Sequence, residues 1–596
     1  MQLLFLDLWR RFAETCRRHK RMGHFTFLDW VVLIVYFALT LCVGLYFWRQ
    51  SRSPEGFTAA KRSMPGWLVG LSIFATYLSS ISYLAYPGKS FVGNWNPFVF
   101  SLAIPFAVWI AVTWFLPYYR KTGDVSAYAN LEFRFGSWAR LYASIFYLFT
   151  QIARIGVVTY LLGLPMSVLF GWDLATVIVV TGITTTIYTF IGGILAVLWT
   201  DAIQTVVLLA GAVVSLIVLS CNIDGGIVAA LPYAFEHGKF SLGELGVAAP
   251  QGTIAFDFGT ATIFVVFLYG FCDNLKNFGI DQSYVQRYQT SKNEAEARKS
   301  LWLGGLLYIP VSALFFLIGT LLFVLYHTGP NHLRDLNEVR QIVAHQKLIQ
   351  SGVVPEYRTD SQTGRRVFAT EYQTKIETLA ATLQDKDIGD RVFPHFIGQY
   401  LPSGLVGLLV AAIFAAGMST ISGSLNSSAT LILRDYYLRF FRPNASDKES
   451  MRVLYAGTII WGCLGTIAAL ILIRLTDSAL DIWWTLVGIF GGGMLGLFLI
   501  GMMIKRARNF SAILAVFIGT VAIFWFTIPD MIRWLKKQGA NDMALSLEWF
   551  SEQLGGASAY HPYMIPVFGT LIMVLLAAVI SFFEREKSVT NGFSKQ

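Results

Sequence analysis

The sequence predicts an all-α membrane protein with about thirteen transmembrane helices, ten of which form two five-helix halves of inverted topology. Three observations lead to this prediction. The 596-residue chain is 55% hydrophobic and 14% charged, whereas a soluble domain carries roughly 25% charged residues. Its apolar residues fall into runs long enough to cross a bilayer. Two of these runs, one of which follows the other five spans later in chain order, are interrupted by polar residues.

The apolar runs follow one another along almost the whole chain. A spanning helix needs about 20 apolar residues, and runs near this length cover residues 27–48, 66–92, 97–119, 139–170, 174–196, 200–222, 258–280, 301–327, 404–434, 453–475, 479–503, 510–529 and 562–583. The polar stretch 328–400 cannot lie in hydrocarbon. We expect it to be an extracellular loop that contains helical pieces.

The distribution of Lys and Arg predicts the orientation. These residues concentrate in every second short loop, as the positive-inside rule requires of cytoplasmic loops. The first span then begins outside and the C-terminus is cytoplasmic, in a multi-pass protein of the cell inner membrane. The basic segment 1–21 contradicts this scheme, because it would lie outside. Since Met22 directly follows this segment, we hypothesise that translation starts there.

The predicted organisation has six parts. They are an N-terminal basic segment (1–25), an extra helix and loop (26–65), the first inverted repeat (66–222), an outer loop (223–257), the second inverted repeat with its extracellular loop (258–503), and C-terminal accessory helices with a tail (504–596).

The interrupted spans are where a transported solute and its coupling ion are expected to bind. Secondary transporters built from inverted repeats expose carbonyls and hydroxyls by unwinding helices near the middle of the bilayer. The second span carries hydroxyl residues over 76–82, and Pro87-Gly88 should end its regular helix. The seventh span is expected to break at Gly270, Asp273, Asn274, Asn277 and Gly279. Any single hydroxyl could instead serve helix packing or bond back to a carbonyl.

Four stretches of the chain resemble the sodium:solute symporter family. They are Ala415–Ser427 with the preceding 401–408, Gly192–Gln204, Asp281–Tyr288 and Tyr128–Phe135, which resemble the eighth core helix, the fifth core helix, the loop after the sixth and the start of the third. The resemblance covers most of residues 25–505 and is closest to the sodium/sialic acid and sodium/monocarboxylate branches. It implies a LeuT-type five-plus-five inverted repeat and sodium-coupled uptake of a small organic solute by alternating access.

The same resemblance implies the sodium ligands. The main Na⁺ site would use carbonyls of the first core helix together with a carbonyl and two hydroxyls of the eighth, namely Ala75, Leu78, Ala416, Ser419 and Thr420. A second sodium site would use Asp201 and Ser422. Gly423 stands where relatives with that site carry another hydroxyl, so one ligand is missing. A structural hydrogen-bonding role for Asp201 therefore stays open, as does the number of sodium ions.

Arg154 indicates the class of solute. It lies inside an apolar span, where an unpaired Arg costs at least about 2.5–3.5 kcal/mol, so it should face a cavity and meet a counter-charge. Its planar fork suits a carboxylate. The alternative is a structural pair or a carbonyl contact, although its own helix contains no Asp or Glu.

The resemblance to sialic acid carriers implies a substrate site of Ser79, Ser80, Ser82 and Arg154. Ser101 replaces a Gln that contacts substrate in those carriers. We therefore expect a carboxylated solute such as sialic acid, with a monocarboxylate, a neutral sugar or an iodide-like anion as alternatives.

Other classes of function fit less well. A sensor would need a signalling domain, and a channel would need a continuous pore. The outer loop contains His332, His345 and His395, but the sequence has no HExxH or GxSxG motif. We therefore expect these histidines to lie on a solvated surface and the protein not to be an enzyme. The five scattered cysteines form no CxxC or Cys/His cluster. The net charge of +10 is explained by Lys and Arg in the cytoplasmic loops. We therefore expect the protein to contact membrane lipid and no nucleic acid. We also expect it to function as a monomer.

Overall fold

The structure, a computed structural model, describes residues 25–48, 50–248, 254–359, 366–475, 479–537, 540–553 and 560–584. The hypothesis about Met22 and the segment 1–21 lies outside these residues. Ten described helices are long and apolar enough to cross a membrane, and one bent helix pair adds an eleventh span. The shorter apolar helices Leu174–Ile187 and Phe490–Met503 fall in the other two predicted runs. Each of the thirteen runs therefore contains a helix.

The first five-helix half begins with a broken helix and ends with a very long one. Its elements are α4 (Gly66–Tyr77), η2 (Ile81–Ala85), α5 (Tyr86–Val92), η3 (Asn96–Phe98), α6 (Val99–Leu102), α7 (Ile104–Ile110), η4 (Ala111–Phe115), α8 (Leu116–Thr122), α9 (Ala129–Phe135), α10 (Ser137–Phe170) and α11 (Leu174–Asn222).

The second half follows an outer connection that holds α12 (Gly226–Glu236), β1 (Val247–Ala248) and β2 (Ile254–Ala255). Its helices are α13 (Ile263–Ile280), α14 (Gln282–Gln289), α15 (Glu294–Thr328), α19 (Leu405–Leu431), η6 (Ile432–Phe441), α20 (Asp447–Leu475) and α21 (Ala479–Met503). Outside the two halves lie α2 (Phe27–Trp48), α3 (Pro54–Ala59), η1 (Ala60–Arg62), α22 (Asn509–Lys537), α23 (Asn541–Gln553) and α24 (Met564–Phe583).

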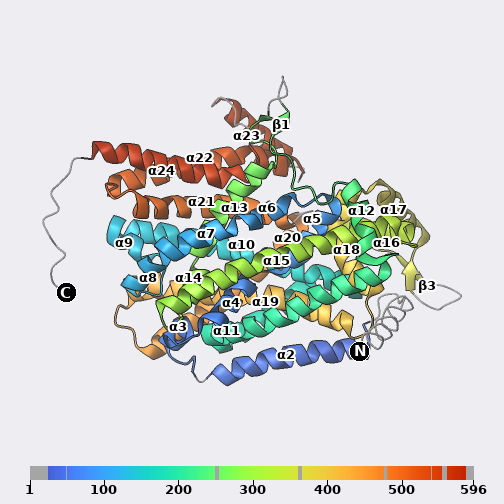
Figure 1. Cartoon of the computed structure of the whole chain (residues 1–596), viewed down its shortest axis with the longest axis horizontal. Coiled ribbons are helices and arrows are strands. Elements are labelled where there is room, and N and C mark those ends of the chain that lie inside the picture. The colour runs from blue at the N-terminus through green and yellow to red at the C-terminus, as the bar shows by residue number, and fades with distance from the viewer. Residues whose placement is uncertain are drawn as a thin grey trace.

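The helices run roughly parallel to the long axis of the molecule (Figure 1). α4 and α19 lie in the centre, where α4 packs on α15 and α19 packs on α11, and the two helices also contact each other. α2 covers α11 and α19 on one side, and α21, α22 and α24 pack together on the other. The start of α2 and the end of α24 lie at opposite ends of the bundle.

The predicted break in the second span is confirmed. α4 ends at Tyr77, and Leu78, at φ −84° and ψ 87°, has left the helical conformation. The chain then continues as a second helical segment bent by 60° from α4. Pro87 does not end regular helix as predicted. It lies within the second helical segment, because the helical residues Ile81–Ala85 of η2 continue directly into α5.

The predicted break in the seventh span is misplaced. α13 continues as one helix to Ile280, and the interruption comes at Asp281, with φ −69° and ψ 121°. The polar residues of α13 pair within the helix, because Asp273 accepts from Lys276 Nζ at 2.5 Å and from Asn277 Nδ2 at 2.9 Å. These intrahelical pairs explain the polar composition without unwinding. The stretch after Asp281, predicted as a loop, is the helix α14.

The fifth and sixth predicted spans form one element, α11. Its bend is at Gly193, at φ 55° and ψ −172°, and not in the predicted gap at 197–199. This conformation is almost restricted to glycine. Asp173 starts α11 as an N-cap, accepting from the Thr176 amide at 2.8 Å, in the manner favoured at helix N-termini.

The polar stretch 328–400 contains helices, as predicted. They are α16 (His332–Gln350), α17 (Thr370–Thr382) and α18 (Asp385–Tyr400), with an antiparallel pair of strands, β3 (Tyr357–Thr359) and β4 (Arg366–Phe368). They gather at the end of the bundle where α2 begins (Figure 1).

The prediction of solvated histidines is wrong for His395, which is 4% exposed. Tyr326 Oη lies 2.7 Å from its Nδ1 and Glu338 Oε2 lies 3.3 Å from its Nε2.

Candidate sodium and solute sites

The predicted ligands of the main sodium site meet where α4 ends against α19. The last four carbonyls of an α-helix have no partner within the helix. Here the Ser419 hydroxyl donates to the Ala75 carbonyl at 2.8 Å, and the Thr420 hydroxyl donates to the Thr76 carbonyl at 3.2 Å. Two carbonyls near the end of α4 are thus satisfied by hydroxyls of α19.

The remaining predicted ligands lie at the same junction. The Ala416 carbonyl accepts from both hydroxyls, from Ser419 at 3.2 Å and from Thr420 at 3.3 Å, and Leu78 follows at the point where α4 ends. All five residues are buried. Neutral carbonyls and hydroxyls are the hard oxygen donors that a small cation takes, and these already point at one another across the junction. The donor set therefore fits Na⁺.

The predicted second sodium site contains an ion pair. Asp201 Oδ2 lies 3.2 Å from Arg287 Nη2, and both side chains are completely buried. The same carboxylate oxygen accepts from the Ser72 hydroxyl at 2.5 Å. Ser422 donates to the Ser419 carbonyl at 3.2 Å. The pairing of Asp201 with Arg287 was not predicted, because the two residues are 86 positions apart in the chain.

The predicted solute residues lie around the break after α4. Ser80 donates to the Val158 carbonyl at 3.1 Å, so it faces α10 one helical turn beyond Arg154. The Ser82 hydroxyl lies 3.0 Å from Tyr308 Oη on α15. Ser79, between Leu78 and Ser80, is 7% exposed. The hydroxyls of this segment thus contact the two helices α10 and α15.

Arg154 has the counter-charge that its burial requires. Its Nη1 lies 3.5 Å from Asp281 Oδ2, and its Nη2 donates to Tyr284 Oη at 3.3 Å. Asp281 occupies the second break, between α13 and α14, and caps α14 by accepting from the Ser283 amide at 2.8 Å. The guanidinium therefore lies beside the second break, while Ser80 belongs to the first.

Aromatic side chains close the space between the breaks, and sequence reasoning missed them. The Tyr77 ring stacks on Phe278 with centroids 5.4 Å apart, and it meets Tyr284 and Tyr308 edge to face at 5.9 and 4.5 Å. Its hydroxyl donates to Asn274. The signal available in the sequence was the aromatic residues adjacent to each break. Ser101, which replaces the expected Gln, accepts from Ser312 at 3.1 Å.

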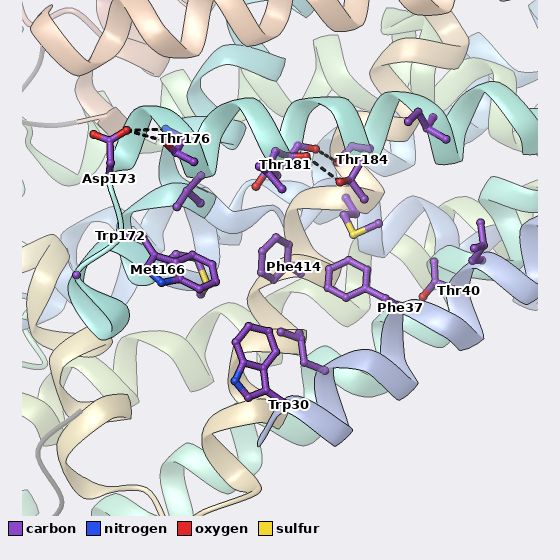
Figure 2. Close-up of a pocket in the computed structure, with 18 residues that line it drawn as sticks. Trp30, Phe37, Thr40, Met166, Trp172, Asp173, Thr176, Thr181, Thr184 and Phe414 are labelled. Carbon is purple, nitrogen blue, oxygen red and sulfur yellow. Dashed lines mark hydrogen bonds between the residues drawn. The ribbon is translucent and has the colours of Figure 1, made fainter. Parts of the chain in front are cut away.

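A large cavity elsewhere has a different character. It measures about 1010 Å³ and lies between α2, α11 and α19 (Figure 2). Apolar and aromatic side chains such as Phe37 and Phe414 line it, and its threonines include Thr184, which donates back to the Val180 carbonyl at 2.8 Å. Among the described residues that line it, Asp173 is the one with a charged side chain. A carboxylated solute would be repelled there.

Comparison with known proteins gives concordant matches. The sequence model of the sodium:solute symporter family matches residues 57–350 and 363–519 of this chain. The sodium/sialic acid symporter NanT of Aliivibrio fischeri is 31% identical over 500 residues, which are 84% of this chain and 87% of that protein. The sodium/sialic acid symporter SiaT of Proteus mirabilis is 31% identical over 507 residues, 84% of this chain and 90% of the relative.

More distant matches agree with these. The human sodium-coupled monocarboxylate transporter 1 is 26% identical over 521 residues, 86% of this chain and 75% of the transporter. A solved structure of a Na⁺-coupled sialic acid symporter, in a substrate-bound outward-open state, superimposes with a TM-score of 0.73 at 26% identity. It covers 94% of this chain and 99% of the solved chain, so the LeuT-type fold is confirmed.

Proposed function

Because the chain belongs to the sodium:solute symporter family, with sodium as its coupling ion, we propose that it takes up sialic acid. The observation that carries this proposal is Arg154, a buried guanidinium beside the second break and one helical turn from Val158, whose carbonyl accepts from Ser80 at the first break. Two relatives at 31% identity are sodium/sialic acid symporters, which supports the choice among carboxylated solutes.

The solute carboxylate takes the place of Asp281 on Arg154. At 3.5 Å the Nη1–Oδ2 separation is longer than the 2.7–2.9 Å of a good charge-assisted hydrogen bond. A free carboxylate can adopt the bidentate geometry that the fork of Arg prefers, whereas Asp281 is held at the N-terminus of α14. Binding then exchanges one carboxylate for another on Arg154, and Asp281 keeps the hydrogen bonds that it accepts from the Ser283 amide and hydroxyl at the N-terminus of α14.

Sodium and solute are coupled through the segment that follows α4. The main sodium site uses Ala75 and Leu78, and the solute residues Ser79, Ser80 and Ser82 follow directly. A cation that holds the carbonyls at the end of α4 against Ser419 and Thr420 also fixes the backbone that carries these serines. Sodium therefore organises the solute site, and alternating access moves both together.

A monocarboxylate is the second candidate. The specific observation in its favour is Ser101, which stands where sialic acid carriers have a substrate-contacting Gln and which accepts from Ser312. A smaller solute would not need that contact. Competition by pyruvate or lactate against sialic acid uptake separates the two candidates.

The protein is further assigned to the cell inner membrane as a monomer, with its N-terminus outside and its C-terminus inside. The elements α3, α8 and α9, which carry or adjoin the basic loops, lie at the end of the bundle where α24 ends (Figure 1). This arrangement supports a cytoplasmic C-terminus. Selective labelling of cysteines introduced into α3 and α17 of intact cells tests the orientation.

Uptake of labelled N-acetylneuraminate into proteoliposomes tests the proposal. An inward sodium gradient should drive uptake, and Arg154→Ala should reduce it about 10- to 100-fold, since a hydrogen bond to a charged group contributes about 1.5–3 kcal/mol. Arg154→Lys should retain only part of the wild-type uptake, because it keeps the positive charge but loses the planar guanidinium that binds a carboxylate through two hydrogen bonds. The exposed Arg298, paired with Glu294, supplies the control Arg298→Ala. Sodium-driven uptake that survives in Arg154→Ala would refute the carboxylate assignment.

A further inference from the structure

Asp201 is a buried carboxylate within a membrane-spanning helix, and such a group needs a cation beside it. The chain supplies one. Asp201 on α11 pairs with Arg287 on α14 at 3.2 Å, with neither side chain exposed. The pair lies near the main sodium site, because Ser72, which bonds both side chains, is one turn before Ala75 and Thr76 on α4.

The guanidinium of Arg287 is fixed from three directions. Its Nε donates to the Ser72 hydroxyl at 2.9 Å, its Nη1 to the Ser283 carbonyl at 2.7 Å, and its Nη2 to Asp201 at 3.2 Å. These partners belong to α4, α14 and α11. A guanidinium with this many directed hydrogen bonds cannot leave Asp201 without leaving several buried groups unpaired.

Gly423 makes this position of Arg287 possible. A Cβ on residue 423 would lie 2.5 Å from Nη2, 2.9 Å from Nη1 and 3.1 Å from Cζ of Arg287. The guanidinium therefore lies directly against the backbone of α19, one turn after Ser419. Any side chain at 423, including a hydroxyl that could bind a cation, would have to displace it.

From these contacts we propose that Arg287 is the permanent cation of the Asp201 site, so that the protein binds and transports a single sodium ion, at the α4–α19 junction. Asp201 Oδ1 has no hydrogen-bond partner among the described residues, and a second sodium ion would have to use this atom. It would then lie beside the guanidinium, where two positive charges repel strongly because the surroundings are dry. The neutral pair offers no net attraction to offset that repulsion.

A single sodium ion has a consequence for the charge moved. One Na⁺ with one monovalent carboxylate carries no net charge across the membrane, whereas two sodium ions would carry one positive charge inward. This part rests on the proposed function, because it takes the solute to be a monovalent anion. The number of bound sodium ions does not rest on it.

The first test is equilibrium binding of radiolabelled sodium to the purified protein without solute. We expect one ion per chain, lost in the double variant Ser419→Ala/Thr420→Val and kept in the double variant Asp201→Asn/Arg287→Gln, which neutralises both charges together. Two ions per chain in the wild type, or a site that remains in the first variant and disappears with Asp201→Asn, would overturn the proposal. Since no solute is present, these outcomes do not depend on what is transported.

The second test uses proteoliposomes and N-acetylneuraminate. We expect a sodium-to-solute flux ratio of one, a Hill coefficient for sodium near one, and no stimulation by an inside-negative potassium diffusion potential. A ratio of two with stimulation by that potential would overturn the proposal. A single bound ion with no N-acetylneuraminate uptake would instead refute the proposed solute and keep the single sodium site. Arg287→Gln leaves Asp201 uncompensated, and it should raise the sodium count to two.

Discussion

Two buried arginines show at the residue scale how the same charge serves different purposes. Arg287 donates to Ser72, Ser283 and Asp201, with distances from 2.7 to 3.2 Å. Arg154 reaches Asp281 at 3.5 Å and Tyr284 at 3.3 Å. The first set of contacts is short and directed from three helices, which suits a permanent pair. The second is longer, which suits a pair that opens for a solute.

Asp281→Asn tests the exchange of carboxylates on Arg154. Asn caps a helix about as well as Asp, so α14 keeps its N-cap, but the charge that competes with the solute is removed. The half-saturating concentration of the carboxylated solute should fall roughly fivefold, within the usual range of coupling between neighbouring ligands. Uptake kinetics in proteoliposomes measure it.

A matched control exists for this variant. Asp173 also caps a helix, α11, by accepting from the Thr176 amide, and it does not contact Arg154. Asp173→Asn should leave the half-saturating concentration unchanged. If Asp281→Asn also leaves the half-saturating concentration unchanged, or raises it, the solute does not compete with Asp281 for Arg154, and the proposed exchange of carboxylates is wrong.

At the scale of elements, breaks and bends position the sites. α4 ends where its carbonyls meet α19, and α13 ends where Asp281 meets α10. The bend in α11 at Gly193 joins the fourth and fifth core helices and directs the second of them, which carries Asp201, along α19. Gly193 packs against Phe57 of α3, and a Cβ there would approach Phe57 Cδ2 to 2.9 Å and its Cα to 3.0 Å.

Gly193→Ala should therefore destabilise the protein strongly. The conformation alone costs of order 1–3 kcal/mol for a residue with a Cβ, and the contact with Phe57 adds to this. Gly171→Ala is the control, since Gly171 also has a positive φ of 65° but lies in the left-handed helical region at ψ 21° and has nothing within 4 Å of its Cβ position. The apparent melting temperature should fall clearly further in Gly193→Ala. Equal losses would show that neither the backbone conformation of Gly193 nor its packing against Phe57 adds a cost beyond that of a positive φ.

The contact of Lys239 with α5 predicts a pH dependence of stability. Lys239 follows α12, outside the spanning helices, and its Nζ donates to the carbonyls of Phe91 at 2.7 Å and Gly93 at 3.1 Å. Burial lowers the pKa of Lys239 from 10.5 to about 8, against an opposing effect of Asp385. The unfolded chain thus binds more protons between these values, and stability rises with pH across that window.

The measurement compares wild type with Lys239→Met. The contribution of the Lys239 titration is complete above the unfolded pKa of 10.5 and is lost as the pH falls through about 8. Between about pH 7.5 and 9.5, the melting temperature of the purified wild type should rise relative to that of the variant. Parallel curves for the two proteins would contradict this assignment.

At the scale of the whole molecule, the pattern of apolar runs predicted the helices because each span is encoded locally. The meeting of the predicted sodium ligands at the α4–α19 junction was also predictable, since these residues lie in two continuous stretches that resemble the family. The partners of Arg154 and Asp201 were not, because each pair joins helices that are distant in the chain. Similarly, the polar residues of α13 suggested a break, although Asp273 is satisfied within the helix by Lys276 and Asn277.

The proposed coupling between sodium and solute involves the whole core, because the predicted residues of the two sites lie on or beside α4, α10 and α19, and Arg154 contacts Tyr284 of α14. If sodium organises the serines after α4, each ligand must tighten the binding of the other by the same factor. This reciprocity can be observed without transport, on the purified protein.

The most direct measurement is the affinity of the purified protein for N-acetylneuraminate, by calorimetry, with saturating sodium and with potassium in its place. We expect sodium to tighten binding about tenfold or more, a coupling of about 1.4 kcal/mol, and Ser419→Ala to abolish this difference. An affinity that is the same in sodium and in potassium would contradict the claim that the α4–α19 junction couples the ion to the solute.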